Sequence, residues 1–158
     1  MTDEPAVVSV SRRIAASPST IFDLLTDPRR HVDIDGTGML RGPQDDARLS
    51  GVGMVFLMNM NNDEFGDYVM KNTVVEFETN SLLAWAPERH DVSSDSPWRH
   101  RWRFRLEPDG NDATIVTEEF DLTHSPDVAK RILRNGERWR ADMERTLETL
   151  NSVVASAA

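Results

Sequence analysis

The sequence predicts an α+β fold in which an antiparallel sheet packs against a long C-terminal helix. Three observations predict it: apolar and polar residues alternate near the start, short β-like segments separated by turn residues fill the middle, and apolar residues recur at helical spacing from Pro126 to about Val154. A single helix cannot bury its own apolar stripe, so we expect the sheet to wrap against it. The 158 residues suit one domain, 1–158, with its core at about 7–154.

The first strand and the first helix follow from local sequence. Val8 and Val10 alternate with polar residues, which is typical of a strand with one buried face. Ser17 then suits a helix N-cap, and Pro18 suits the first helical position. Pro28 disfavours helical backbone at the residue before it, so we expect this helix to stop there.

Six further segments are expected to be strands. Turn residues, such as those in ETNS and PDGN, separate neighbouring segments, and connections this short join antiparallel strands. The expected strands are Met39 to Gln44, Val52 to Met60, Asp67 to Thr79, Leu82 to Ala86, Trp98 to Pro108 and Ala113 to Leu122. Together with the first strand they form the expected sheet.

The last part of the chain is expected to form one long helix. Ser125 suits its N-cap and Pro126 its first position, which repeats the pattern before the first helix. Its apolar stripe includes Trp139 and Met143. At 1.5 Å per residue the helix would be about 40 Å long, enough to cross a small sheet.

The stretch PWRHRWRFRLEPDG, 97–110, combines arginines with aromatic rings. On a strand the pleat places the rings and the arginines on opposite faces, whereas a nucleic-acid surface needs both on one side. The net charge of -9 also repels phosphate backbones, so we predict no nucleic-acid partner. We expect Arg101 to lie opposite or diagonal to Glu119. Arg99 is expected near Asp121, and both pairs are expected on a solvated face.

On the aromatic face, the same register brings Glu118 close to Trp102 and diagonal to His100. Two interpretations of this ionisable pair stay open. It is either a hydrogen-bonded buried pair or a polar end of the face that reaches solvent, or it is a polar anchor inside a cavity. In the second interpretation burial and mutual contact shift both pKa values, and His100 and Glu118 are candidate catalytic residues.

Several motifs support a family resemblance: RRIAAS at the end of the first strand, IFDLLTDP in the first helix, the VVEFETNSLLAW hairpin and the final amphipathic helix. With the order of elements, they resemble the SRPBCC superfamily, which includes START-like domains and polyketide cyclase/dehydrase proteins. The resemblance covers about Val7 to Val154. It implies a helix-grip fold, in which a curved antiparallel β-sheet wraps around a long C-terminal α-helix, with short helices after the first strand.

The resemblance also implies an apolar cavity between sheet and helix that binds a hydrophobic small molecule, aromatic, polyketide-like or lipid-like. One fold serves many functions, so two alternatives stay open: a cyclase/dehydratase-type enzyme that uses His100 and Glu118 for proton transfer, and a co-chaperone-like module that binds proteins. Side chains could also fill the cavity. The residues expected to line it are Val75, Phe77, Trp85, Trp98, Trp102, Phe104, Phe120, Trp139 and Met143.

No motif predicts a metal or an organic cofactor. The H-x-D-x-D spacing at His31 to Asp35 offers too few ligands, and we expect a solvated loop near the cavity mouth. The chain has no cysteine for disulfides or thiolate sites. We expect a cytoplasmic protein without membrane insertion, because the start lacks a signal-like pattern and no apolar run is long enough. The oligomeric state stays open, with a homodimer among the options.

Overall fold

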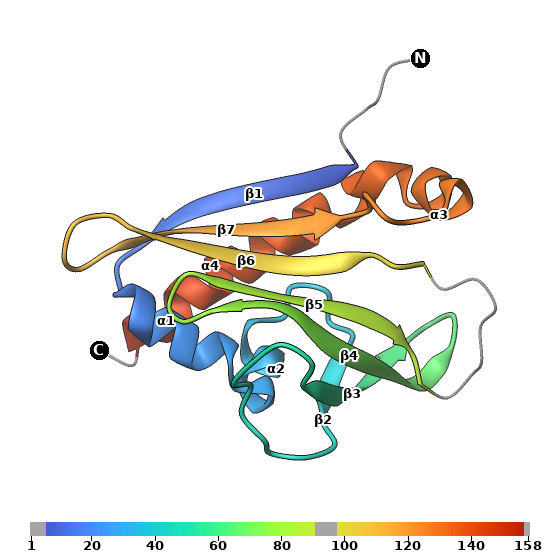
Figure 1. Ribbon diagram of the computed structural model, residues 1–158, viewed down its shortest axis with the longest axis horizontal. Coiled ribbons are helices and arrows are strands. Elements are labelled where there is room, and N and C mark those ends of the chain that lie inside the picture. The colour runs from blue at the N-terminus through green and yellow to red at the C-terminus, as the bar shows by residue number, and fades with distance from the viewer. Residues whose placement is uncertain (1–5, 91–97, 157–158) are drawn as a thin grey trace.

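The computed structural model describes residues 6–90 and 98–156, which form a seven-stranded antiparallel sheet with helices packed on one side of it (Figure 1). The strands follow the order β1-β7-β6-β5-β4-β3-β2. They are β1 (Val7–Ile14), β2 (Leu40–Pro43), β3 (Val55–Asn62), β4 (Gly66–Glu78), β5 (Leu82–Arg89), β6 (Arg101–Pro108) and β7 (Thr114–Asp121). The predicted α+β architecture is therefore confirmed, with β1 added beside the last strand.

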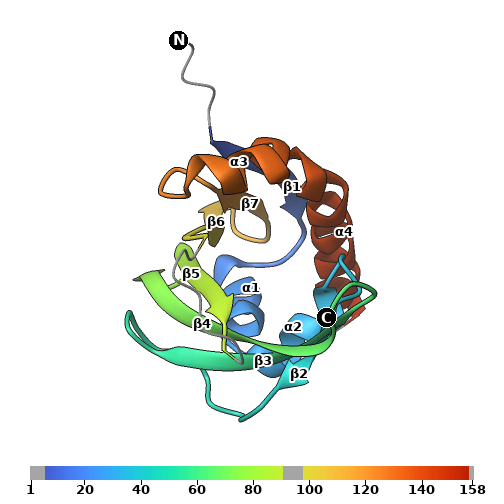
Figure 2. The same cartoon turned by 90° about the vertical axis from the view of Figure 1, so that its right-hand side faces the viewer.

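The helices fall into two groups, one after β1 and one after β7. They are α1 (Pro18–Leu25), η1 (Pro28–Arg30), α2 (His31–Ile34), α3 (Asp127–Ile132), η2 (Arg134–Trp139) and α4 (Arg140–Ser156), where η denotes a 3₁₀ helix. Figure 2 shows the sheet as a curved half-barrel whose open side is closed by α2 and α4. No helix of the described residues is both long and apolar enough to span a membrane.

Helix α1 forms as its sequence predicts. The Ser17 hydroxyl accepts the backbone N–H of Thr20 at 3.3 Å, and Pro18 occupies the first position. The helix ends at Leu25, before Pro28, which begins the short η1 turn. The confirmed boundaries show that capping and proline rules determine this element locally.

The prediction of one unbroken C-terminal helix is wrong. Arg134 and Gly136 have positive φ angles of 49° and 92°, which end α3 and separate it from α4. A Cβ at Gly136 would lie 2.8 Å from Cδ1 of Phe120, so only glycine fits this close approach. The expected Ser125 cap is also absent: the N-cap position is Pro126, and the Ser125 hydroxyl has no partner among the described residues. The break brings η2 against the sheet.

A buried arginine lies on the outer face of the sheet, which corrects the expected solvated arginine face. Arg103 is 6% exposed. Its guanidinium donates to Glu76 at 2.7 Å, to Glu119 at 3.1 Å and to Asp121 at 3.2 Å. Three carboxylates, one from β4 and two from the neighbouring β7, surround it, so the arginine is enclosed by its partners.

The other expected arginine pairs are partly wrong. Arg101 lies opposite Asp121 and so is diagonal to Glu119, as expected. Arg99, however, precedes β6 and has a left-handed φ of 57°, so it does not continue the strand toward Asp121. The carboxylates expected to pair with these two arginines bind Arg103 instead.

The apolar core fills one half of the inner face of the sheet. There, α1 and the C-terminal part of α4 pack on the sheet, and the fully buried side chains include Ile14, Ile21, Leu83, Leu147 and Leu150. The other half of the inner face, where β6 begins and β7 ends, carries larger rings and several polar side chains. That half positions the candidate site.

Candidate functional site

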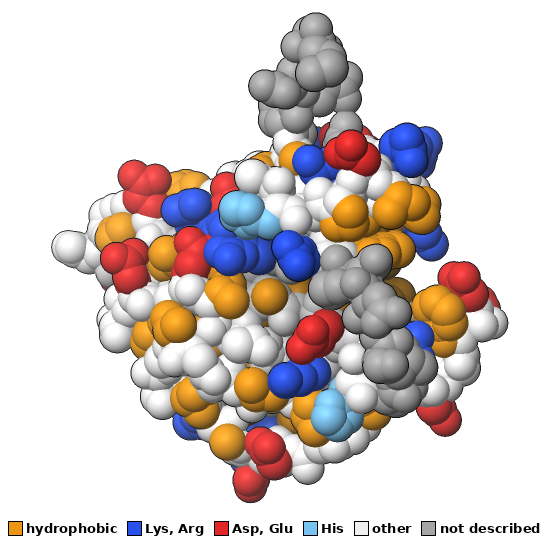
Figure 3. Space-filling model, turned by 45° about the vertical axis from the view of Figure 1, so that its right-hand side comes forward, with side chains coloured by type: hydrophobic (Ala, Val, Ile, Leu, Met, Phe, Trp, Pro, Cys, Tyr) orange, Lys and Arg blue, Asp and Glu red, His pale blue; other side chains and the backbone are white. Residues whose placement is uncertain are grey.

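A cavity of about 1300 Å³ lies between the inner face of the sheet and the segments α2, α3 and η2. Its wall is rich in aromatic and methionine side chains from β3 to β7. Phe65 and Ile132 line its edge and are 53% and 54% exposed, so the cavity opens between the β3–β4 hairpin and α3. Figure 3 shows hydrophobic side chains on both sides of this opening. The expected cavity is therefore not filled by side chains.

Most of the predicted site residues lie on this wall. His100 and Glu118, the two candidate catalytic residues, both line the cavity. The predicted lining residues that do so are Trp85, Trp98, Trp102, Phe104, Phe120 and Trp139. The period-two alternation in β6 and β7 holds without interruption, so the aromatic face that it predicts points into the cavity.

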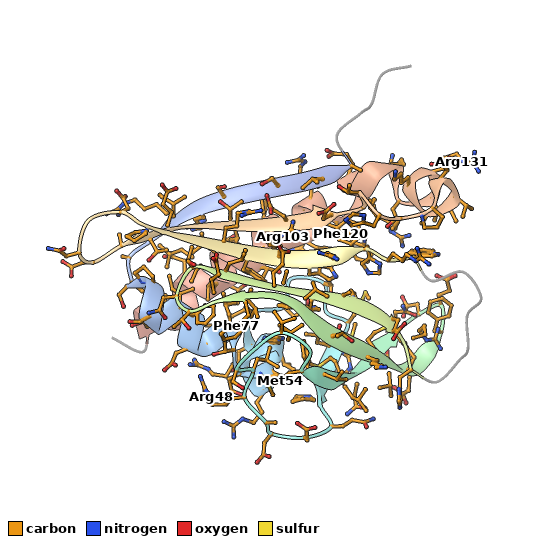
Figure 4. All side chains as sticks on the ribbon, viewed as in Figure 1. Arg48, Met54, Phe77, Arg103, Phe120 and Arg131 are labelled. Carbon is orange, nitrogen blue, oxygen red and sulfur yellow. The ribbon has the colours of Figure 1, made fainter. Side chains whose placement is uncertain are left out.

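Three predicted lining residues lie elsewhere. A β-bulge between Val74 and Glu76 shifts the alternation of β4, so Val74 is buried in the core and Val75 does not line the cavity. Phe77 packs edge-on against Phe22 of α1, with ring centroids 5.3 Å apart, in the core half of the inner face and away from Phe120 (Figure 4). Met143, on α4, is 1% exposed, and its side chain is part of the apolar core.

Phe120 is the centre of the aromatic wall. Its ring lies 4.5 Å from the Trp102 ring, 5.2 Å from the His100 ring and 6.3 Å from the Trp139 ring, centroid to centroid. β6, β7 and η2 thus contribute to one cluster. The break before η2 makes this cluster possible, because Gly136 lets the chain approach Phe120 closely enough to place Trp139 beside it.

Three buried polar atoms on the cavity wall have no hydrogen-bond partner among the described residues: Nδ1 of His100, Oε2 of Glu118 and Nε1 of Trp139. A buried polar group is usually paired, and leaving one unpaired costs about 1–3 kcal/mol. His100 and Glu118 therefore do not form the hydrogen-bonded pair that one interpretation expected. The two side chains are placed as the other interpretation expected, as polar groups inside a cavity.

The strand register also corrects the expected position of Glu118. Glu118 lies opposite Phe104, and Trp102 lies opposite Phe120, so Glu118 is close to Trp102 as expected, but its diagonal neighbour is Trp102 and not His100. His100 precedes β6 and has no cross-strand partner in this ladder. The two ionisable groups share the cavity without sharing a hydrogen bond.

Burial favours the uncharged form of both groups. It raises the pKa of the Glu118 carboxyl well above its usual value of 4.5, and the negative charge of Asp35 adds to the shift. Burial also lowers the pKa of His100 to about 4. An uncharged Glu118 carboxyl can donate a proton, and a neutral His100 imidazole has a nitrogen that can accept one.

The expected solvated loop at His31 to Asp35 is wrong. Residues His31–Ile34 form α2, and His31 is 5% exposed on the cavity wall. Its Nε2–H donates to the Leu25 carbonyl at 2.7 Å, and its ring stacks on Trp85 at 5.2 Å. Burial lowers its pKa, so the imidazole is neutral. In the described part of the chain no group of three or more potential ligands could hold a metal ion.

The sequence reasoning missed much of the cavity floor. Phe56, Met58 and Met60 line it from β3, and their spacing of two residues was a readable signal for one inner face. Asn72 lies on the same face of β4, where its amide donates to the Phe56 carbonyl at 3.4 Å. The burial of His31 had no such signal, because it depends on the turn that follows Pro28.

The raised pKa of Glu118 predicts a pH-dependent effect on stability. A carboxyl group with a higher pKa in the folded state destabilises the fold progressively as the pH rises above 4.5. The reason is that the group ionises freely in the unfolded chain, whereas in the buried site its ionisation is unfavourable. Glu118→Gln should raise the free energy of unfolding by about 1–3 kcal/mol at pH 7.5 and much less at pH 4. Urea unfolding at both pH values measures this.

The exposed Glu144 on α4 provides the matched control. Glu144→Gln should change the free energy of unfolding by about 0.5 kcal/mol or less at either pH. An equal gain from Glu118→Gln at pH 4 and pH 7.5 would contradict a buried, protonated Glu118.

Comparison with known proteins gives one group of sequence relatives. No protein-family model matches the chain. Rv0088, an uncharacterized protein of Mycobacterium tuberculosis, is 34% identical over 131 residues, which are 82% of this chain and 53% of that protein. The chain therefore spans about half the length of the curated relatives it matches.

Solved structures match nearly the whole chain. Protein MLL2253 from Mesorhizobium loti has a TM-score of 0.69 at 18% identity, over 96% of this chain and 98% of that one. A START superfamily protein from Mycobacterium smegmatis has a TM-score of 0.65 at 17% identity, over 96% of this chain and 99% of that one. The chain has a START-like, helix-grip fold. Its curved sheet, short helices after β1 and long α4 are the elements of that fold.

A third structure connects the helix-grip fold to a biosynthetic locus. DynU16, a putative protein in the dynemicin biosynthetic locus, has a TM-score of 0.64 at 16% identity and covers 98% of this chain, which corresponds to 49% of DynU16. At such identities the likeness concerns the fold. The cavity chemistry of this helix-grip protein depends on its own residues.

Proposed function

We propose that this protein is an SRPBCC-type binding protein that holds a hydrophobic small molecule in the cavity between the sheet and the C-terminal segment. The observation that carries the proposal is the open aromatic cavity with three unpartnered buried polar atoms on its wall. Empty apolar space and unpaired polar groups both cost stability, and one bound molecule would offset both costs.

The size and lining of the cavity favour a flat or flexible apolar ligand. Tryptophan and phenylalanine rings suit an aromatic ring system, and Met58, Met60 and Met70 adapt their shape to the rest. Burying about 300 Å² of apolar ligand surface would supply about 7 kcal/mol before the costs of binding are subtracted. Hydrogen bonds to the unpaired polar atoms would have to add to this gain for binding to reach the micromolar range, which corresponds to about 8 kcal/mol.

Filling the cavity should abolish binding of a neutral apolar probe. The double variant Met60→Trp/Met70→Trp adds two bulky rings at diagonal positions on the inner face of β3 and β4. We expect its affinity for N-phenyl-1-naphthylamine to fall at least about tenfold, because the rings occupy ligand space. A fluorescence titration measures this affinity.

The opposite face offers a matched control. Leu57 and Val69 are also diagonal neighbours on β3 and β4, but they do not line the cavity. Leu57→Trp/Val69→Trp should leave probe affinity within about twofold of the unsubstituted protein. Equal affinity of both double variants for the probe would mean that the cavity is not the binding site.

Native mass spectrometry of the freshly purified protein tests the proposal without a chosen probe. A co-purified apolar compound that is released on unfolding supports it. A protein that carries no such compound and binds no N-phenyl-1-naphthylamine contradicts it.

A second candidate function is a cyclase/dehydratase-type enzyme. It is favoured by the neutral His100 and the protonated Glu118, which are an unpaired base and an unpaired acid on one cavity wall. In such a reaction His100 would accept a proton from a substrate carbon. Glu118 would donate a proton to the substrate oxygen that leaves as water or that becomes a hydroxyl when the ring closes. Dehydration lowers the mass of the compound by one water, whereas ring closure alone changes its chromatographic retention and leaves its mass the same. A compound that changes in neither respect during incubation with the protein limits the function to binding.

A further inference from the structure

The unpartnered atoms of the cavity wall have a definite hydrogen-bonding character. The Trp139 indole N–H can only donate, Oε2 of a protonated Glu118 can donate or accept, and Nδ1 of His100 donates or accepts according to the tautomer. Donors are thus well represented. A ligand oxygen that accepts hydrogen bonds, with or without a proton of its own, satisfies this set.

These atoms lie around one ring. His100 and Trp139 both pack against Phe120. Glu118 is two residues before Phe120 on the same face of β7, which places the two Cα atoms about 7 Å apart. One polar substituent, or two on neighbouring positions of a ring, can therefore reach the set while the rest of the ligand contacts the aromatic wall.

The electrostatics inside the cavity disfavour a negative charge. Asp35 lies on the wall, and its side-chain carboxylate accepts the backbone N–H groups of Met39 at 3.1 Å and Leu40 at 3.2 Å. Asp142 lines the cavity as well. Both carboxylates act on any ionised group that enters.

The cations of the described wall lie at its outer part and have contacts of their own. Lys71 is 3.7 Å from Glu88, and the Arg89 guanidinium stacks on Phe65 and Tyr68 at 5.0 and 4.9 Å from the ring centroids. Arg138 is exposed and stacks on Trp139 at 5.5 Å. An anionic group beside Glu118 would lose its hydration and find two carboxylates on the wall, which is strongly unfavourable.

We infer that the site selects uncharged ligands whose polar group is a hydroxyl or a carbonyl, and that it rejects carboxylates and phosphates at that position. This inference rests on the proposed function, because it specifies which hydrophobic molecules the cavity accepts. Compounds with a ring hydroxyl, a ketone or a long-chain alcohol should bind with that group at this position. A free fatty acid or a phospholipid headgroup should not bind there.

Three anthracenes that differ at one position test the inference on the full chain: 9-anthracenemethanol, 9-methylanthracene and 9-anthracenecarboxylate. At pH 7.5, quenching of tryptophan fluorescence reports each affinity. The alcohol should bind about fivefold more tightly than the methyl compound, which corresponds to one net hydrogen bond, and at least about tenfold more tightly than the carboxylate.

Two variants of one residue separate recognition from a general effect on the fold. Glu118→Gln keeps a donor and an acceptor, so the preference for the alcohol over the methyl compound should persist. Glu118→Leu removes both, so this preference should fall to about twofold or less while the methyl compound still binds. A loss of affinity for all three compounds in equal proportion would assign Glu118 a structural role and overturn the inference.

The outcomes also separate the inference from the proposed function. If none of the three anthracenes binds, the proposed function fails and the inference fails with it. If all three bind with equal affinity, or the carboxylate binds most tightly, the inference is overturned and the hydrophobic site remains. Tightest binding of the alcohol, lost in Glu118→Leu and kept in Glu118→Gln, supports both.

Discussion

Arg103→Leu should lower the free energy of unfolding by about 3–5 kcal/mol, because it leaves three carboxylates close together without their cation. Arg103 donates to Glu76, Glu119 and Asp121 while being 6% exposed. Its removal therefore costs more than the loss of four hydrogen bonds, since the remaining negative charges repel each other in a partly buried site. Urea unfolding at pH 7.5 measures the change.

The neighbouring arginine on the same face is the matched control. The Arg105 side chain is 52% exposed and contacts Glu119 at 2.9 Å. Arg105→Leu should cost about 1 kcal/mol or less, as expected for an exposed ion pair. Equal costs for the two variants would show that enclosure of Arg103 contributes nothing.

The cost of Arg103→Leu should also depend on pH. Burial raises the pKa of Asp121, but hydrogen bonds from Thr123 and from Arg103 outweigh this effect and lower it below 3.8. A lowered pKa gives stability that is present above the unfolded-state value and is lost as the pH falls. The difference between the variant and the unsubstituted protein should therefore shrink below about pH 4, where the carboxylates become protonated.

Gly36→Ala should be the most damaging small substitution, with a loss of about 3 kcal/mol or more. A Cβ at Gly36 would overlap the backbone oxygen of Asp142 and lie 2.8 Å from the backbone nitrogen of Thr146. Gly36 also donates its N–H to the Thr146 hydroxyl at 2.9 Å and accepts from Arg145 at 2.8 Å. The turn after α2 is thus docked directly on the backbone of α4, and any side chain must push the helix away.

Gly51 gives the control for the loss of glycine itself. A Cβ at Gly51 meets no atom within 4 Å. Gly51→Ala should change the free energy of unfolding by less than about 1 kcal/mol and can raise it, because alanine restricts the unfolded chain. Thermal unfolding of both variants measures the difference, and similar melting temperatures would contradict the close docking at Gly36.

The fold was predictable because its signals are local. The Ser17 cap, Pro28 and the alternation in β6 and β7 each act within a few residues. The break in the C-terminal helix was not predictable from periodicity, since the apolar spacing continues through Gly136 while the backbone leaves the helix. The candidate site likewise has parts with local sequence signals and parts without them. The Trp102 and Phe120 face was predictable from strand parity.

Residues whose environment comes from distant segments were not predictable. Val75 was assigned to the cavity because strand parity does not reveal the bulge beside Val74. His31 was expected in solvent, and its burial depends on contacts with Trp85 and the Leu25 carbonyl. Arg103 was expected in solvent as well, and its burial depends on Glu76, which arrives from β4, two strands away in the sheet.

The alternation of β7 also protects the sheet against a shift in pairing. Glu118 faces the cavity without a charged partner, whereas Glu119 and Asp121, on the opposite face, hold Arg103. A slip of β7 by one residue would turn both ionised groups into the cavity and expose Phe120. The shifted register would therefore bury two charges and leave Arg103 without its carboxylate partners. The acidic residues of β7 thus favour the native pairing over its nearest competitor, and they also stabilise it.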